Sequence, residues 1–298
     1  MDKKKNRLKK TELQTLRTFQ KENPSQYFSH FKNKKFYLDY QKNIERIYTE
    51  YFKLPIKLFN NSEIIDLGAG TGDNTLHFSN WGAKCSLVEM NNLAINIAKK
   101  LFKKYAKNKT SHKFIKSSVF DFKSNKKYEF VKCTGVLSHT ADKEKAFKKI
   151  AKLVKPGGFF IFGDQTKSGE FQNMLQRYAV FNLTDDDEEM VKICEYLFKN
   201  DIDRSQKAVP RTRRAIIFDR WIIQQQDDPT VKNIIEWASQ SDMKLYSSFP
   251  SITSQLEGDS RHYKRKIDLN KFYNIFSLSE LIWMSHTEQD EKFLKKIN

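Results

Sequence analysis

Ile64–Asp73 reads IIDLGAGTGD, which is a short apolar strand, an acid, and three glycines at every second position. β-Branched residues at its start are typical of a strand buried on both faces, and the glycines permit a sharp turn with positive φ. A helix is expected over residues 73–81, with free N–H groups at its first turn. The spacing is G-x-G-x-G, whereas the nicotinamide and flavin fingerprint is G-x-G-x-x-G. The offset argues against a dinucleotide, and the alternative is a turn that only links a strand to a helix.

A second strand strengthens the prediction of a ligand site. Residues 85–89 read CSLVE, an apolar run that ends in Glu89. This acid lies about 20 residues beyond the glycines, which is the separation expected of a carboxylate that binds ribose hydroxyls. Taken alone, Glu89 would be an ordinary charge at the end of a strand. Taken with the glycine turn, it favours the ribose role.

From these motifs onward the chain resembles the class I S-adenosylmethionine-dependent methyltransferases, over roughly residues 60–165. The third strand and its loop match HKFIKSSVFD at 112–121, and the fourth strand and its turn match YEFVKCTGVLSHT at 128–140. An amphipathic helix is expected over 142–154, and KPGG at 155–158 precedes the strand 159–162. The resemblance implies an α/β fold: a doubly wound, mostly parallel, Rossmann-like sheet of the seven-stranded type. It also implies N-terminal helices and a helical insert over the active site.

The resemblance further implies S-adenosylmethionine as the cofactor and assigns residues to it. Many relatives carry an Asp where this chain has Ser118, so the adenine amino group would meet a weaker hydroxyl acceptor or the backbone of Val119. Asp66 would orient the amino group of the methionine end, and Glu89 would bind the ribose. The methionine end would lie on Gly68, Ala69, Gly70 and Gly72, the adenine beside Met90, Ser118 and Val119, and the methyl group near Thr134 and Gly135.

Methyl transfer to oxygen benefits from a base, and histidine is the usual one near neutral pH. His139 lies in the turn that faces the substrate in the family, although a lone loop histidine is more often structural. The apolar segment around Trp221 is the candidate acceptor pocket, with Phe218, Asp219 and Arg220 beside it. The competing interpretation is a core helix whose charged pair faces solvent.

The leading hypothesis is therefore a methyltransferase acting on an oxygen or nitrogen of a small-molecule metabolite. The formal net charge of +18 leaves open an RNA or protein methyltransferase that uses a basic surface. Lysine is spread along the whole chain, as a biased composition would produce, so nucleic acid is not favoured as a partner. A third alternative is an assembly protein that binds the cofactor without turnover. The sequence leaves the oligomeric state open.

Several classes of protein are excluded by what the sequence lacks. The three cysteines form neither a disulfide framework nor a C-x-x-C metal pattern, and no metal site is expected. No stretch approaches the 18 or more apolar residues of a membrane span, and the N-terminus lacks a secretory signal. A cytoplasmic protein is expected.

The chain is expected to divide into four parts. Residues 1–58 form an N-terminal helical cap, with helices over 1–22 and 36–52. Residues 59–167 and 229–255 form the cofactor-binding core, in which 243–249 is a late strand. Residues 168–228 form a helical insert or lid, with a polar connection at 200–210, and residues 256–298 form a C-terminal helical segment.

Overall fold

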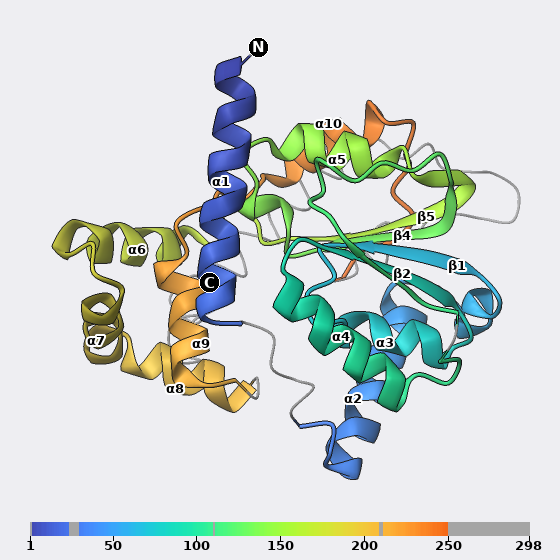
Figure 1. The fold of residues 1–298 in the computed structure, drawn as a ribbon, viewed down its shortest axis with the longest axis horizontal. Helices are drawn as coiled ribbons and strands as arrows, with labels where there is room; N and C mark the ends of the chain where they lie inside the picture. Colours follow the sequence, from blue (N-terminus) through green and yellow to red (C-terminus); the bar gives the residue numbers. More distant parts are fainter. Residues whose placement is uncertain (1, 24–29, 110, 209–210, 250–298) are drawn as a thin grey trace, which may run out of the picture.

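A parallel sheet lies at the centre of the molecule (Figure 1). The computed structural model describes residues 2–23, 30–109, 111–208 and 211–249. The sheet order is β3-β2-β1-β4-β5, so the strand order reverses beside β1. The predicted doubly wound, Rossmann-like α/β fold is confirmed, with five strands rather than seven in the described ranges. The strands are β1 (Glu63–Leu67), β2 (Lys84–Glu89), β3 (Lys113–Lys116), β4 (Tyr128–Thr134) and β5 (Val154–Gly163).

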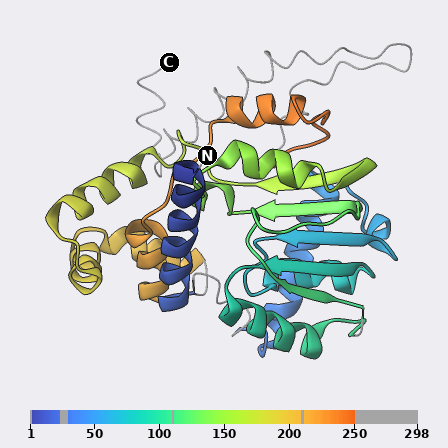
Figure 2. The same ribbon diagram turned by 45° about the horizontal axis from the view of Figure 1, so that its top comes forward.

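Helices cover both faces of the sheet, and the alternation of β1 decides which side chain meets which layer. Ile64 packs into one core with Phe102, whereas Ile65 packs into the other with Phe147. Both isoleucines are fully buried, as the apolar run predicted. The first layer holds α2 (Lys34–Arg46), α3 (Asp73–Asn80) and α4 (Asn92–Tyr105); the second holds α5 (Lys143–Ala151) and α10 (Val231–Ser239) (Figures 1 and 2).

A separate group of helices stands beyond the carboxyl ends of the strands. It comprises α6 (Phe171–Leu183), α7 (Asp187–Leu197), α8 (Lys199–Ala208), α9 (Arg213–Ile217) and the turn η5 (Phe218–Ile222), and it has an apolar core of its own. The long helix α1 (Asp2–Lys21) lies between this group and the sheet (Figures 1 and 2). Lys21 forms an ion pair with Asp187, and Glu22 lies 3.7 Å from Arg214. Ligands of open α/β sheets bind at this end of the strands.

Three sequence predictions are wrong in this part of the structure. The expected connection at 200–210 is largely helix α8, which the Lys199–Asp203 pair and the buried Ile202 hold in place. Residues 243–249 form no strand, although the Tyr246 ring packs 5.2 Å from that of Phe159. Strand β5 already begins at residue 154, before the KPGG sequence.

The other expected elements follow the sequence closely. The first helix runs over residues 2–21, and the second begins at Lys34 and continues as a π-helical turn to Tyr51. The N-cap of α10 is Thr230, in a capping box with Asn233. The expected helical segment 256–298 lies outside the described residues. The division into four parts stays a prediction.

Candidate functional site

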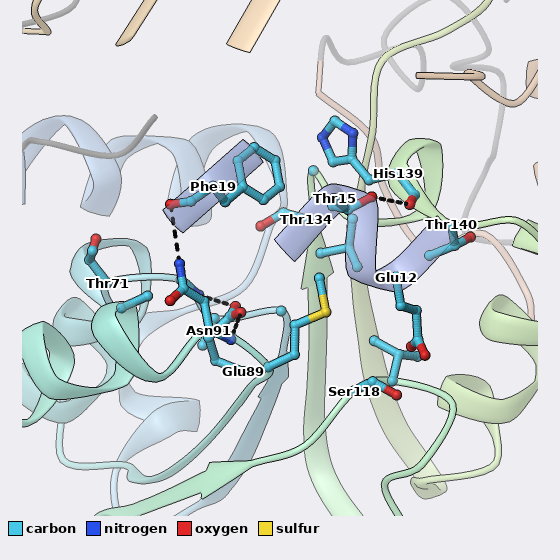
Figure 3. A pocket seen from close by; sticks show the side chains of 18 of the residues that line it. Glu12, Thr15, Phe19, Thr71, Glu89, Asn91, Ser118, Thr134, His139 and Thr140 are labelled. Carbon is cyan, nitrogen blue, oxygen red and sulfur yellow. Dashed lines mark hydrogen bonds between the residues drawn. The ribbon is translucent and has the colours of Figure 1, made fainter. Parts of the chain in front are cut away.

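A cavity of about 240 Å³ lies at the carboxyl ends of β1, β2 and β4, and helix α1 closes one side of it (Figure 3). Glu12, Thr15 and Phe19 of α1 line this side. Two hydrogen bonds hold the helix in place: the Thr15 hydroxyl donates to the His139 carbonyl (3.3 Å), and the Asn91 amide donates to the Phe19 carbonyl (3.2 Å). The cavity is thus lined by residues that lie far apart in the sequence, from Glu12 to Asp219.

The glycine turn forms one wall, and its glycines serve different purposes. Gly68, Gly70 and Gly72 all have positive φ, at 76°, 55° and 76°. A Cβ atom at Gly70 would meet nothing within 4 Å, so this residue leaves bare backbone beside open space. A Cβ atom at Gly68 would collide with Val136, and one at Gly72 would lie 2.9 Å from Leu87. Gly68 and Gly70 line the cavity, whereas Gly72 starts α3 and packs against the core.

Glu89 ends β2 and fixes the turn from the side. Its Oε2 accepts a hydrogen bond from the Gly70 N–H (2.9 Å), and its Oε1 accepts one from the Asn91 N–H (2.8 Å). Burial raises the pKa of this carboxyl, while the backbone donors oppose the rise. Each carboxylate oxygen can accept a second hydrogen bond, and Glu89 lines the cavity with its neighbour Met90. The residue therefore couples the shape of the turn to whatever ligand occupies it.

Asp66 lies behind the cavity wall rather than in it. Its side chain is 1% exposed, and Oδ2 accepts hydrogen bonds from Lys132 Nζ (2.9 Å) and from the Thr75 hydroxyl. Oδ1 is buried and has no hydrogen-bond partner among the described residues. Lys132 does line the cavity, and its ammonium also donates to the Thr134 hydroxyl (2.9 Å). The cavity thus meets a lysine where the sequence led us to expect an aspartate.

The far wall carries Ser118 and Val119, which follow β3, together with Met90. The Ser118 hydroxyl accepts from the Asp121 N–H (3.1 Å). Glu12 of α1 approaches the same hydroxyl, and burial raises the pKa of its carboxyl (Figure 3). A carboxylate is therefore present beside Ser118 after all, and it comes from another element of the fold.

The end of β4 and the turn after it bring Thr134, Gly135 and His139 to the cavity. The Nδ1 atom of His139 lies 3.0 Å from the carbonyl oxygen of Gln225. A carbonyl only accepts, so Nδ1 carries the proton and Nε2 of the neutral ring keeps its lone pair. The ring of Phe19 packs edge-on against the imidazole at 5.3 Å. His139 is thus held in the tautomer that a base at Nε2 requires.

The predicted acceptor pocket is only partly at the cavity. Asp219 lines it, whereas Phe218 and Trp221 lie in the core of the helical group. The Trp221 indole is fully buried, stacks on Phe198 at 5.2 Å and donates from Nε1 to Gln176 (2.9 Å). The apolar surfaces of Phe218 and Trp221 are used for packing, because the helical group needs a core of its own.

Lys132 and Glu12 are among the cavity residues that the sequence analysis did not identify. Lys132 gave a signal, since it is a charged residue between apolar neighbours in strand β4. Glu12 gave none, because its partner Ser118 lies far along the chain and only the tertiary fold brings them together.

No group of three His, Cys, Asp or Glu side chains is placed to hold a metal ion in the described ranges. No helix within the described residues combines the length and the apolar character needed to cross a membrane.

Comparison with known proteins identifies a family for this chain and supports its fold. The family model described as methyltransferase domain matches residues 37–194, just over half of the chain. Among solved structures, PKMT2 from Rickettsia typhi in complex with AdoHcy shares 17% identity and a TM-score of 0.51, covering 66% of this chain and 42% of that one. Its likeness supports the fold. None of the curated proteins searched matches the chain.

Two further structures are similar over shorter stretches. YcgJ from Bacillus subtilis is 23% identical over 41% of this chain and 55% of its own, with a TM-score of 0.36. The sugar N-methyltransferase KedS8 from Streptoalloteichus is 19% identical over 42% and 47%, with a TM-score of 0.33. The chain thus spans about two fifths to just over half of the length of these three structures. It belongs to the methyltransferase domain family.

Proposed function

We propose that this methyltransferase acts on an oxygen or nitrogen of a small-molecule metabolite. The observation that carries the proposal is the charge of the cavity. Lys132 is the only lysine or arginine among its described lining residues, and its ammonium is paired with Asp66. The carboxylates that line it are Glu12, Asp73, Glu89 and Asp219. A nucleic-acid acceptor would bring phosphates to this mouth, where carboxylates repel them. The surplus of lysine in the chain lies elsewhere.

The residues at the cavity fit S-adenosylmethionine. The open space at Gly70, the buried acid at Glu89 and the wall of Met90 and Val119 suit an amino acid, a ribose and an adenine in turn. We assign the methionine end to Gly68, Ala69 and Gly70, and the vicinity of the methyl group to Thr134 and Gly135. When bound, the cofactor supplies an electrophilic methyl group together with its own leaving group.

The protein has three tasks in this reaction: to align the acceptor, to exclude water and to take up a proton. Helix α1 and the turn after β4 enclose the cavity. Nε2 of His139 would accept the proton of the acceptor hydroxyl or amine, because Nδ1 is committed to the Gln225 carbonyl. Glu12 would accept from the exocyclic amino group of adenine in place of the missing Asp at position 118.

Two measurements test the proposal. Calorimetry with S-adenosylhomocysteine should show binding to the wild-type chain and to Glu129→Ala, but much weaker binding to Glu89→Ala. Glu129 is a matched control, since it is also a strand carboxylate but lies away from the cavity.

Transfer of a labelled methyl group should then be assayed with hydroxyl- and amine-bearing metabolites, with total RNA and with protein. Labelling of metabolites alone supports the proposal. Labelled RNA, together with an RNA affinity that falls steeply as salt rises, would replace it with the nucleic-acid alternative. Labelled protein would replace it with the protein alternative.

A further inference from the structure

Lys132 occupies an unusual place for a lysine, in the middle of strand β4 and opposite Asp66 in the pairing with β1. Its side chain is only 6% exposed, yet the residue lines the cofactor cavity. Burying an ammonium ion costs several kcal/mol unless other groups compensate. A neutral residue would pack in the same strand without that cost, so the position of the charge calls for a reason.

The hydrogen bonds of Lys132 account for two of its three donors. One goes to Asp66 Oδ2 and one to the Thr134 hydroxyl, both at 2.9 Å. An ammonium has three N–H groups, and the third has no partner among the described residues. The two partners lie on β1 and β4, so they hold the ammonium between the strands, at the floor of the cavity.

Asp66 is arranged to hold the lysine rather than a ligand. Its carboxylate is fully buried, is absent from the cavity lining, and accepts a second hydrogen bond from the Thr75 hydroxyl. The charge that the floor presents to a ligand is therefore positive. Elsewhere the cavity is lined by carboxylates, so this single cation selects where a ligand's own carboxylate can lie.

We propose that Lys132 binds the carboxylate of the methionine end of the cofactor through its third N–H, and that Asp66 is a positioning residue that acts through Lys132. This inference rests on the assignment of the cavity to S-adenosylmethionine. It replaces the expectation that Asp66 contacts the cofactor's amino group. The glycine turn and Glu89 would position the remainder of the cofactor, while Lys132 would discriminate for the carboxylate.

The test compares two ligands that differ only in that carboxylate: S-adenosylhomocysteine and its decarboxylated analogue. Affinities are measured by calorimetry on the full chain. A hydrogen bond between charged groups is worth about 1.5–3 kcal/mol, so the wild type should prefer S-adenosylhomocysteine by about 10- to 150-fold. In Lys132→Met the preference should fall to about threefold or less, through weaker binding of S-adenosylhomocysteine alone.

Two further variants make the result interpretable. Lys132→Met leaves Asp66 buried without its partner, so Lys132→Met/Asp66→Asn removes both charges and should bind as Lys132→Met does. Lys143→Met removes a lysine that pairs with Asp227 outside the cavity, and it should keep the wild-type preference. Circular dichroism checks that each variant is folded.

Equal affinity of the wild type for both ligands, or an undiminished preference in Lys132→Met/Asp66→Asn, would overturn the role of Lys132 and leave the cofactor assignment intact. Failure of the wild type to bind either ligand would overturn the cofactor assignment itself, and the inference with it.

Discussion

Alanine at position 68 would place its Cβ atom closer to Val136 Cγ2 than van der Waals contact allows, and 3.2 Å from Cγ1. The φ of Gly68 is +76°, a region that costs a side chain about 1–2 kcal/mol. Val136 is β-branched and stiff, so the collision adds a packing cost of about 1–3 kcal/mol. We expect Gly68→Ala to lower the free energy of unfolding by about 2–5 kcal/mol.

Three other variants separate the contributions. Gly70→Ala carries the same kind of backbone cost at φ +55° but meets nothing within 4 Å, so it should cost only about 1–2 kcal/mol. Val136→Ala removes both colliding methyl groups and leaves its own Cβ at an ordinary 3.4 Å. The double variant Gly68→Ala/Val136→Ala should therefore be more stable than the sum of the single effects, by the packing cost of about 1–3 kcal/mol.

Urea unfolding followed by circular dichroism, on all four proteins and the wild type, measures these differences. Strict additivity of Gly68→Ala and Val136→Ala would refute the reasoning, because the collision would then carry no energy. A Gly70→Ala variant as unstable as Gly68→Ala would refute it too, since the loss would come from the backbone alone.

Three further predictions concern the cavity and its surroundings. His139→Gln should reduce the rate of methyl transfer by at least about 100-fold while S-adenosylhomocysteine binds within about threefold of the wild type, because only a base is lost; unchanged turnover in single-turnover assays would remove His139 from the chemistry. Glu12→Ala should weaken S-adenosylhomocysteine binding about tenfold, whereas Glu22→Ala, directly after the same helix, should not; equal effects would mean that the negative charge of this segment, not the contact beside Ser118, matters. Burial, followed by the nearby Glu170 and Asp164 carboxylates, raises the pKa of Asp228 from 3.8 to about 6. Asp228 thus holds its proton more tightly in the native state than in the unfolded state, so its ionisation destabilises the fold. This destabilisation is absent below pH 3.8, grows as the pH rises to about 6 and is constant above pH 6. Asp228→Asn should therefore be more stable than the wild type by at most about 3 kcal/mol at pH 7.5 and by almost nothing at pH 3.5, as urea titrations at both pH values would reveal; a gap that does not change with pH would contradict this.

The sheet could be predicted from the sequence because its signals are local. The apolar runs of β1 and β2, the glycines after β1 and the amphipathic pattern of α5 each lie within about one element of structure. Helix α8 escaped notice because it is polar all round except for Ile202, which is its one fully buried side chain. An i,i+4 ion pair and packing beside α9 stabilise this helix, and neither produces a periodic apolar pattern in the sequence.

The cavity was predictable on the sides that the glycine turn and the ends of β2, β3 and β4 build, but not on the side formed by α1 or at Lys132. Gly68, Gly70 and Glu89 follow from motif spacing, and each lies in the cavity wall. The Asp66–Lys132 pair depends on β1 lying next to β4 in the correct register, which a single sequence does not reveal. Trp221 was predicted to line the acceptor pocket but lies in the core of the helical group, because a large aromatic side chain can pack in a core as well as against a ligand.

The position of α1 has a kinetic consequence. Because α1 closes one side of the cavity, a ligand that passes by this side must wait until the bonds from Thr15 to His139 and from Asn91 to Phe19 are broken. If each bond contributes about 1 kcal/mol, the two together would leave both bonds broken for about one-thirtieth of the time. Exchange of a ligand by this side is then coupled to the opening of the chain itself.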